Sequence, residues 1–501
     1  MLLNYLKKNT DSLIAAAIGF VVIMLFTDYG GIGISPDSIV YAGTARSIVS
    51  GNGFVDYSGS PLVIFPLFYP FFLGVVMFIS QRDIIAIAPV LNGLMFAALI
   101  FLSGTLIERF KYKTNLYKRI ILIITAFSPS LIEIYSMLWS ESLFILLVLV
   151  FILLFHRYLL THSFLSLIIA AIVAAMAFDT RYAGITIVAT GCVLIFFDKN
   201  LGWKKTSEHI LLFGSIGISF TVLNLIRNYF KNGLLTGERQ EGITPLSKNI
   251  EYSGTVLSDW FSLHIERQMF FEILAIAVMV LFLVFFIKNI NHWKSYYTYE
   301  NIAVSFFIVY VLFIVLSSTI SRYETINNRL LAPAFLPLLW ISTCQIPKWR
   351  NSMPHRKLKW VFFVFSVGIA GVLIGSYFAI NRENLSYINE TGIPGYGEDT
   401  WTKSPIVNYI QKHKELFEND STIYSNHSAA VYFLSGHLVS TLPERAYKDD
   451  MADFKQTPYS LLIWFNLDKN TDVISLKEVH MLKKMERIKS FSDGAIFVLK
   501  N

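Results

Sequence analysis

The chain has 501 residues, of which 54% are hydrophobic and 15% charged, whereas a soluble domain carries charge on about a quarter of its residues. The net charge of +7 does not indicate nucleic-acid binding, because the basic residues lie in short segments between apolar runs, where membrane topology accounts for them. Both cysteines, Cys192 and Cys344, fall inside apolar runs, which excludes a disulfide framework and a thiolate metal cluster.

Apolar runs long enough to cross a membrane recur from the N-terminus to about residue 380. They predict an all-α polytopic membrane domain over residues 1–380, with about 11 transmembrane helices. The expected helices are 12–26, 84–106, 120–136, 142–156, 164–178, 183–197, 208–226, 269–287, 301–320, 331–346 and 360–380. The first run lacks a small-residue cleavage site, so we expect a transmembrane helix there and not a signal peptide.

Basic residues predict the orientation of these helices. Lys7 and Lys8 precede the first helix, which favours a cytoplasmic N-terminus in a multi-pass cell-membrane protein. Segment 62–80 is also apolar, but if it crossed the membrane, the basic loop 107–119 would lie outside. Two prolines in its first half also weaken a straight spanning helix. We therefore expect 62–80 to lie in the outer interface as part of a juxtamembrane loop.

The remaining residues, 381–501, are more polar, and their apolar runs are too short to span a membrane. Short alternating runs predict strands, and one amphipathic run predicts a helix. The strand candidates are STIYSN, SLLIWFN and GAIFVLK, and the helix candidate is PIVNYIQKHKELF. Together they predict a small C-terminal α/β domain on the extracytoplasmic side.

The first outer loop, Asp28–Pro70, is too rich in Gly, Ser and Pro to cross a bilayer. It carries two acids near the expected membrane surface, Asp28 and Asp37. Asp37 opens a helical pattern in which apolar residues recur on one face until Gly51. A carboxylate on an amphipathic helix just outside the membrane indicates a reaction at the lipid surface.

Polar side chains at other helix ends fall on the same outer side. They are Asp37, Glu141, Arg181, Arg227, Arg322 and Arg329. Each has a structural alternative, because Asp37 and Glu141 suit helix N-termini and the arginines can snorkel to headgroups. Their convergence on one face favours a site, since polar groups at a membrane boundary are costly without a cavity or partner.

Arginines bind phosphate through forked hydrogen bonds, and a carboxylate takes a proton from an attacking hydroxyl or binds a divalent metal. Phosphate held at a membrane surface indicates a lipid phosphate. The carboxylates would then serve the transfer of the group that this lipid carries.

Several motifs resemble one family of membrane enzymes. The strongest match is SPDSIVYAGTARSIVSGNGF followed by PLVIFPLFYPFFLG. Further matches follow in the family's order: WSESLF, TRYAGI, LIRNYFKNGLLTGER, NNRLLAPAFLP and IYSNHSAAVYFLSGHLVSTLP. The chain resembles the GT-C glycosyltransferases that use polyprenyl-phosphate sugars, a group that includes protein O-mannosyltransferases and the aminoarabinose transferases that modify lipid A.

The resemblance implies transfer of a hexose or pentose from a polyprenyl-phosphate donor to an acceptor hydroxyl on the outer face, with inversion. The acceptor is a protein, a lipid or a glycan. Asp37 would act as general base and Glu141 as a second catalytic acid, with Arg181, Arg227 and Arg329 at the donor phosphate. Additional candidates are Asp28, Tyr41, Arg239 and Arg322. A divalent metal stays an open alternative with Asp37 as its first ligand, because the first loop lacks the adjacent acidic pair of some relatives.

The main alternative is a transporter or flippase of a lipid-linked glycan, whose path the charged residues would line. No inverted repeat is evident, and the charges gather at one face, which disfavours a path through the membrane. A lipid-linked oligosaccharide polymerase or ligase and an inactive scaffold are further alternatives.

Overall fold

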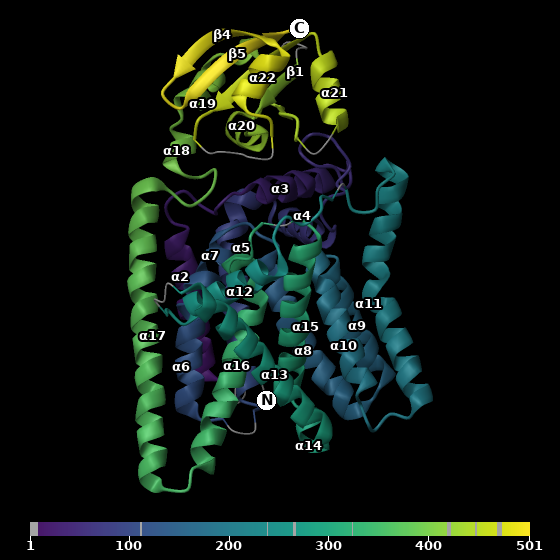
Figure 1. Cartoon of the computed structure of the whole chain (residues 1–501), viewed down its shortest axis with the longest axis vertical. Helices are drawn as coiled ribbons and strands as arrows, with labels where there is room; N and C mark the ends of the chain where they lie inside the picture. Colours follow the sequence, from purple (N-terminus) through teal and green to yellow (C-terminus); the bar gives the residue numbers. More distant parts are fainter. Residues whose placement is uncertain are drawn as a thin grey trace.

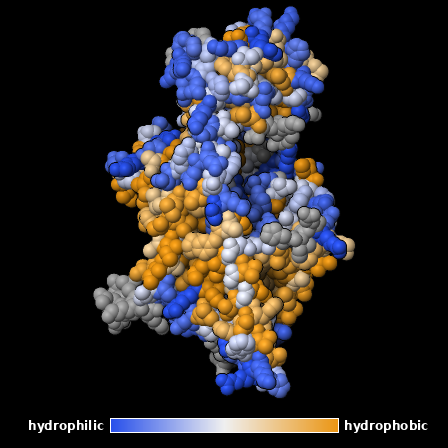
Figure 2. Space-filling model, turned by 90° about the vertical axis from the view of Figure 1, so that its left-hand side faces the viewer, coloured by the Kyte–Doolittle hydropathy of each residue, from blue (hydrophilic) through white to orange (hydrophobic). Residues whose placement is uncertain are grey.

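The computed structural model describes residues 9–110, 113–237, 239–263, 267–322, 324–417, 422–445, 448–467 and 473–501. A helical body carries a smaller, sheet-containing unit at one end (Figure 1). On the face shown in Figure 2, hydrophobic side chains form a band across the helical body, and the sheet-containing unit is mainly hydrophilic. Lys7 and Lys8, on which the predicted orientation rests, lie outside the described residues.

The described chain confirms a polytopic helical protein, because seven helices are long and apolar enough to span a membrane. They are α5 (Ile84–Ile107), α8 (Glu141–Thr161), α11 (Trp203–Asn232), α13 (Gln268–Asn291), α15 (Tyr299–Ile320), α16 (Asn328–Ser352) and α17 (Arg356–Thr391). The bent pair α6 (Asn115–Ala126) and α7 (Pro129–Ser136) adds an eighth. The expected count of eleven is reached only when the shorter apolar helices α2 (Thr10–Phe26), α9 (Phe164–Phe178) and α10 (Ile185–Phe196) are included.

The break between α6 and α7 replaces the single helix expected over 120–136. The two helices meet at an angle of 46°. Pro129 has no N–H to donate and starts α7, while the Ser128 hydroxyl caps it by accepting the Leu131 N–H at 3.4 Å. The short helix α7 then leads directly into the turn before α8.

Two helices of the first loop, α3 (Pro36–Val49) and α4 (Phe68–Ser80), lie between the helical body and the sheet-containing unit (Figure 1). Ser35 and Ser38 form a capping box that starts α3 one residue before Asp37. Helix α4 has 13 residues and is therefore about 20 Å long, short of the roughly 30 Å hydrocarbon core. This length suits the interfacial position expected for 62–80.

The loop after α11 contains α12 (Leu246–Trp260), and the short helices η1 (Tyr182–Gly184) and α14 (Trp293–Tyr296) precede α10 and α15. Helix α17 continues past residue 380, so the expected domain boundary at 380/381 falls inside it. The sheet-containing unit follows at Gly392, and we call residues 392–501 the C-terminal unit.

The C-terminal unit contains a five-stranded sheet of order β2-β1-β3-β5-β4. Strand β1 is parallel to β2 and β3, while β5 is antiparallel to β3 and β4. The strands are β1 (Thr422–Ser425), β2 (Ser440–Thr441), β3 (Tyr459–Phe465), β4 (Lys484–Phe491) and β5 (Gly494–Lys500). The helices are α18 (Asp399–Thr402), α19 (Pro405–Lys412), η2 (Lys414–Leu416), α20 (Ser428–Ser435), α21 (Lys448–Gln456) and α22 (Leu476–Leu482). All three predicted strands are present, whereas the two-residue strand β2 and the mostly exposed, polar strand β4, which form the two edges of the sheet, were not predicted.

The turn between α9 and α10 depends on a glycine at close range. A Cβ at Gly184 would lie 2.4 Å from the Ala177 carbonyl oxygen and 2.5 Å from the Phe178 Cα. Gly184→Ala should therefore destabilise the protein by about 1–3 kcal/mol through overpacking, measured as a lower Tm in detergent. Gly375→Ala is the control, because nothing lies within 4 Å of its new Cβ. Equal Tm values for the two variants would contradict the close packing of this turn.

Candidate functional site

Four charged side chains from four separate segments meet beneath the C-terminal unit. The Arg329 Nη2 atom lies 2.5 Å from Asp37 Oδ2, and its Nε atom lies 2.5 Å from Glu141 Oε1. The Arg181 Nη1 atom pairs with the same Glu141 oxygen. The result is a continuous chain, Asp37–Arg329–Glu141–Arg181, with two negative and two positive charges, which we call the charge network.

Each member of the charge network stands at a helix end. Asp37 and Arg329 are the second residues of α3 and α16, and Glu141 is the first residue of α8. Arg181 directly precedes η1. The Asn327 side chain caps α16 by accepting the Leu330 N–H at 3.0 Å, which fixes the turn that carries Arg329. A carboxylate also suits the positive end of a helix dipole, so the helix-end and ion-pair roles of Asp37 and Glu141 are compatible.

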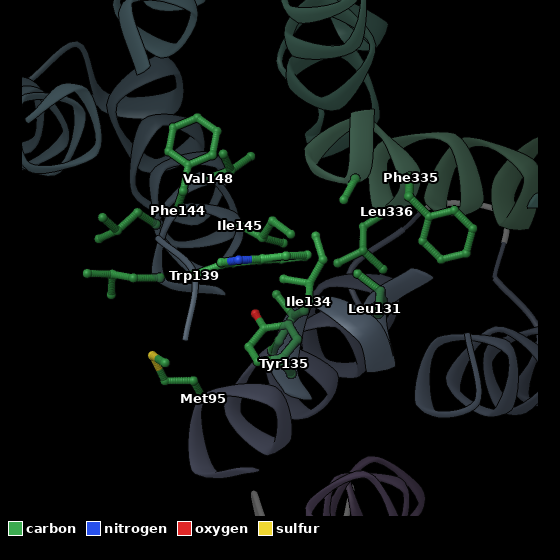
Figure 3. Close-up of a cluster of buried hydrophobic side chains, with 14 of the residues drawn as sticks. Met95, Leu131, Ile134, Tyr135, Trp139, Phe144, Ile145, Val148, Phe335 and Leu336 are labelled. Atoms are coloured by element: carbon green, nitrogen blue, oxygen red, sulfur yellow. The ribbon is translucent and has the colours of Figure 1, made fainter. Parts of the chain in front are cut away.

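The Trp139 indole packs against the Arg329 guanidinium of the charge network. The Arg329 guanidinium lies over its ring, 4.3 Å from the centroid. Figure 3 shows the indole among apolar side chains of α7, α8 and α16, including Ile134, Ile145 and Leu336. Its Nε1–H donates to the Ser35 hydroxyl at 2.9 Å, which ties the indole to the start of α3. The hydrophobic core that holds the Trp139 ring therefore fixes the position of the Arg329 guanidinium.

The two carboxylates of the charge network differ in their exposure to solvent. The Glu141 side chain is fully buried, and its Oε2 atom has no hydrogen-bond partner among the described residues. The Asp37 side chain is 28% exposed and uses Oδ2 toward Arg329. Only Asp37 is thus open to a ligand from outside the protein, while Glu141 holds the two arginines together.

Tyr41 reaches the charge network through a serine. Its hydroxyl lies 3.4 Å from the Ser140 Oγ atom, to which Arg181 Nη1 donates at 3.1 Å. The ring packs edge-on against Phe65 and Tyr69. Burial raises the pKa of Tyr41, so its hydroxyl stays protonated at neutral pH.

The structure does not bring Arg227 into the charge network. Its guanidinium instead donates to the backbone carbonyls of Leu62 at 2.8 Å and Phe54 at 2.9 Å. These contacts hold the two sides of the first loop together. Asp28 is exposed at the start of that loop, and among the described residues the ion pairs of the charge network do not include it.

Two further predicted arginines lie along the loop after α11. Arg239 lies over the ring of Tyr182, the neighbour of Arg181, at 5.4 Å from the centroid. Arg322 follows α15 and donates to the Gln240 side chain at 2.5 Å. A bridge between Glu241 and Ser321 joins the two segments. This places Arg239 beside the Arg181 turn, next to the charge network and outside it.

Sequence reasoning did not single out two acids near the site. Glu324 lies 3.8 Å from Arg329 Nη1 at the protein surface. Asp179 is 93% buried at the end of α9, and its Oδ1 atom has no partner among the described residues. Its backbone carbonyl accepts the Phe68 N–H at 2.8 Å, which joins the Arg181 turn to the start of α4. Burial raises the pKa of Asp179 to about 7.

The described residues contain no group of three or more His, Cys, Asp or Glu side chains that could hold a metal ion. In the charge network, the arginines contact one oxygen of each carboxylate, Asp37 Oδ2 and Glu141 Oε1. Carboxylates beside arginines suit proton transfer and anion binding.

No family model and no curated protein matches the sequence. Among solved structures, the chain is similar to ArnT from Cupriavidus metallidurans bound to undecaprenyl phosphate, at a TM-score of 0.58 and 11% identity over 97% of both chains. The same ArnT in the apo state gives a TM-score of 0.58 and 12% identity over 97% of both chains. Archaeal oligosaccharyltransferase AglB from Archaeoglobus fulgidus, in complex with an inhibitory peptide and a dolichol-phosphate, gives a TM-score of 0.53 and 9% identity over 91% of this chain and 70% of AglB. These likenesses show that the chain shares the fold of ArnT and AglB, as the resemblance to GT-C enzymes led us to expect.

Removing the central carboxylate tests the charge network. Glu141→Gln keeps the side-chain shape but leaves Arg181 and Arg329 with one carboxylate, so we expect a loss of about 3–5 kcal/mol in stability. Glu324→Gln is the matched control, because the Glu324 side chain is 44% exposed and its 3.8 Å contact with Arg329 should contribute less than about 1 kcal/mol. Thermal unfolding in detergent measures both, and equal losses would refute a buried network.

Asp179 should give stability a particular pH dependence. The unfolded carboxyl ionises near pH 4, whereas the folded one holds its proton to about pH 7. The folded state binds more protons in this window, so stability falls as pH rises, by up to about 1.4 kcal/mol per pH unit. Asp179→Asn cannot ionise, so its Tm should gain on the wild type between pH 5 and pH 8. The exposed control Asp28→Asn should keep a constant Tm difference from the wild type over this pH range. The same constant difference for Asp179→Asn would contradict the burial of this acid.

Proposed function

We propose that this chain is a membrane glycosyltransferase that moves a sugar from a polyprenyl-phosphate donor to an acceptor hydroxyl. The observation that carries the proposal is the charge network, a paired set of carboxylates and arginines at the helix ends below the C-terminal unit. The fold supports it, because the similar ArnT and AglB structures hold undecaprenyl phosphate and dolichol-phosphate.

In the proposed reaction, Asp37 takes the proton from the acceptor hydroxyl as its oxygen bonds to the anomeric carbon of the sugar. The bond from that carbon to the phosphate oxygen breaks, and its electron pair leaves on the polyprenyl phosphate. Attack from the face opposite the phosphate inverts the anomeric configuration. The partial exposure of Asp37 and the full burial of Glu141 favour Asp37 as the base and Glu141 as the residue that positions the arginines.

The leaving phosphate gains negative charge, which guanidinium groups at a partly buried site stabilise. We assign this role to Arg329 and Arg181, whose charges are already fixed at the site by Glu141. Arg239, which lies over Tyr182 next to the charge network, would be a further phosphate contact. The carbonyl contacts of Arg227 favour a different task, namely holding the first loop in shape.

We infer that the site faces the extracytoplasmic side. The connection between α16 and α17, at the end of the bundle away from the C-terminal unit, carries the basic run that the positive-inside rule assigns to the cytoplasm (Figure 1). The donor sugar would therefore be used on the side where the C-terminal unit stands.

The test is donor consumption by purified protein in liposomes with a panel of polyprenyl-phosphate sugars and a membrane extract as the source of acceptors. Asp37→Asn should lower the rate by roughly 10²–10⁴-fold, as loss of a general base does. Asp28→Asn, which changes an exposed acid of the same loop, should keep the wild-type rate.

Equal rates for wild type and Asp37→Asn would refute the role of Asp37. A donor sugar that crosses the bilayer unchanged while none is transferred would refute the transferase and favour the flippase alternative. Added EDTA should leave the rate unchanged if arginines rather than a metal balance the carboxylates.

A further inference from the structure

The residues just before Asp37 are paired on both sides. Gly33 forms a parallel bridge with Met137, and Ile34 forms one with Gly395. The Gly33 N–H donates to the Ser136 carbonyl at 2.8 Å, and the Leu138 N–H donates to the Gly33 carbonyl at 3.0 Å. On the other side, the Tyr396 N–H donates to the Ile34 carbonyl at 2.8 Å.

The outer partner belongs to residues 392–397, the first segment of the C-terminal unit after α17, which we call the linker. Gly395 has a φ of +96°, and a Cβ there would lie 2.2 Å from the Ile34 carbonyl oxygen. Only glycine combines this backbone conformation with so close an approach. The contact between linker and first loop is therefore built into the sequence at Gly395.

These pairings fix the distance between the two carboxylates. Ile34 is three residues before Asp37, and Leu138 is three residues before Glu141. The Ser38 hydroxyl adds a bond to the Leu138 carbonyl at 3.0 Å. Three backbone segments therefore lie side by side. The middle segment, residues 33–34, leads to Asp37, and its inner neighbour, residues 137–138, leads to Glu141. The linker pairs with the outer side of the middle segment.

The C-terminal unit holds the same loop at a second place. The ring of Tyr57, near the tip of the loop, stacks on Tyr432 of α20 with centroids 4.5 Å apart. Helix α20 lies directly above α3 in Figure 1. The loop that carries Asp37 is therefore held at its beginning by the linker and at its tip by α20.

We propose that the C-terminal unit positions the Asp37 loop for the reaction, and that Gly395 is its principal positioning residue. This inference rests on the proposed function for its catalytic consequence, but the ordering of the loop is measurable without activity. A shift of about 1 Å at a catalytic group is enough to lower a rate roughly 10²-fold. Loss of the linker contact should therefore lower kcat and leave the KM for the donor nearly unchanged.

The experiment compares Gly395→Ala with Gly436→Ala in the full-length protein. Gly436 also has a positive φ, +79°, but nothing lies within 4 Å of its new Cβ, so it controls for backbone strain alone. Hydrogen–deuterium exchange of residues 32–38 should accelerate by about tenfold or more in Gly395→Ala and stay at the wild-type rate in Gly436→Ala. Tyr432→Ala should accelerate exchange around residue 57.

Unchanged exchange of residues 32–38 in Gly395→Ala would overturn the inference, as would an equal fall of kcat in Gly436→Ala. Faster exchange with a lower kcat and an unchanged KM supports it. If the wild type consumes no donor at all, the proposed function fails, and the exchange data alone still decide whether the C-terminal unit orders the loop.

Discussion

The pairing of Arg329 with Asp37 and Glu141 is the interaction on which the rest of the site depends. Taking an unpaired charge out of water costs several kcal/mol, so a fully buried Glu141 requires cationic partners. Arg329 and Arg181 supply them from segments far apart in the sequence. The first loop, the start of α8, the Arg181 turn and the start of α16 are thereby tied to one point.

This constraint explains why the surrounding backbone is so closely determined. Trp139 sets the position of the Arg329 guanidinium, the Gly33–Met137 bridge sets the register of the first loop, and Gly184 keeps the Arg181 turn tight. Charged groups at a buried site bind and react well only when they are preorganised. The packing of the bundle thus holds the charged groups in the positions that the proposed chemistry needs.

Much of the fold follows from the sequence because apolar runs and basic loops report directly on membrane helices. The acids and arginines at helix ends were also identifiable, since such residues are costly at a membrane boundary without partners. The pairing among them was not, because Arg329 meets Asp37 across 292 positions of the chain. Arg227 shows the same limit, since backbone carbonyls at Phe54 and Leu62 leave no mark in a sequence pattern.

The most direct test of the central claim is a cryo-EM structure of the protein in nanodiscs with undecaprenyl phosphate. The account predicts the phosphate at hydrogen-bond distance from Arg329 or Arg181, about 2.7–2.9 Å. A phosphate bound elsewhere, with Asp37 and Arg329 still closed on each other, would contradict it.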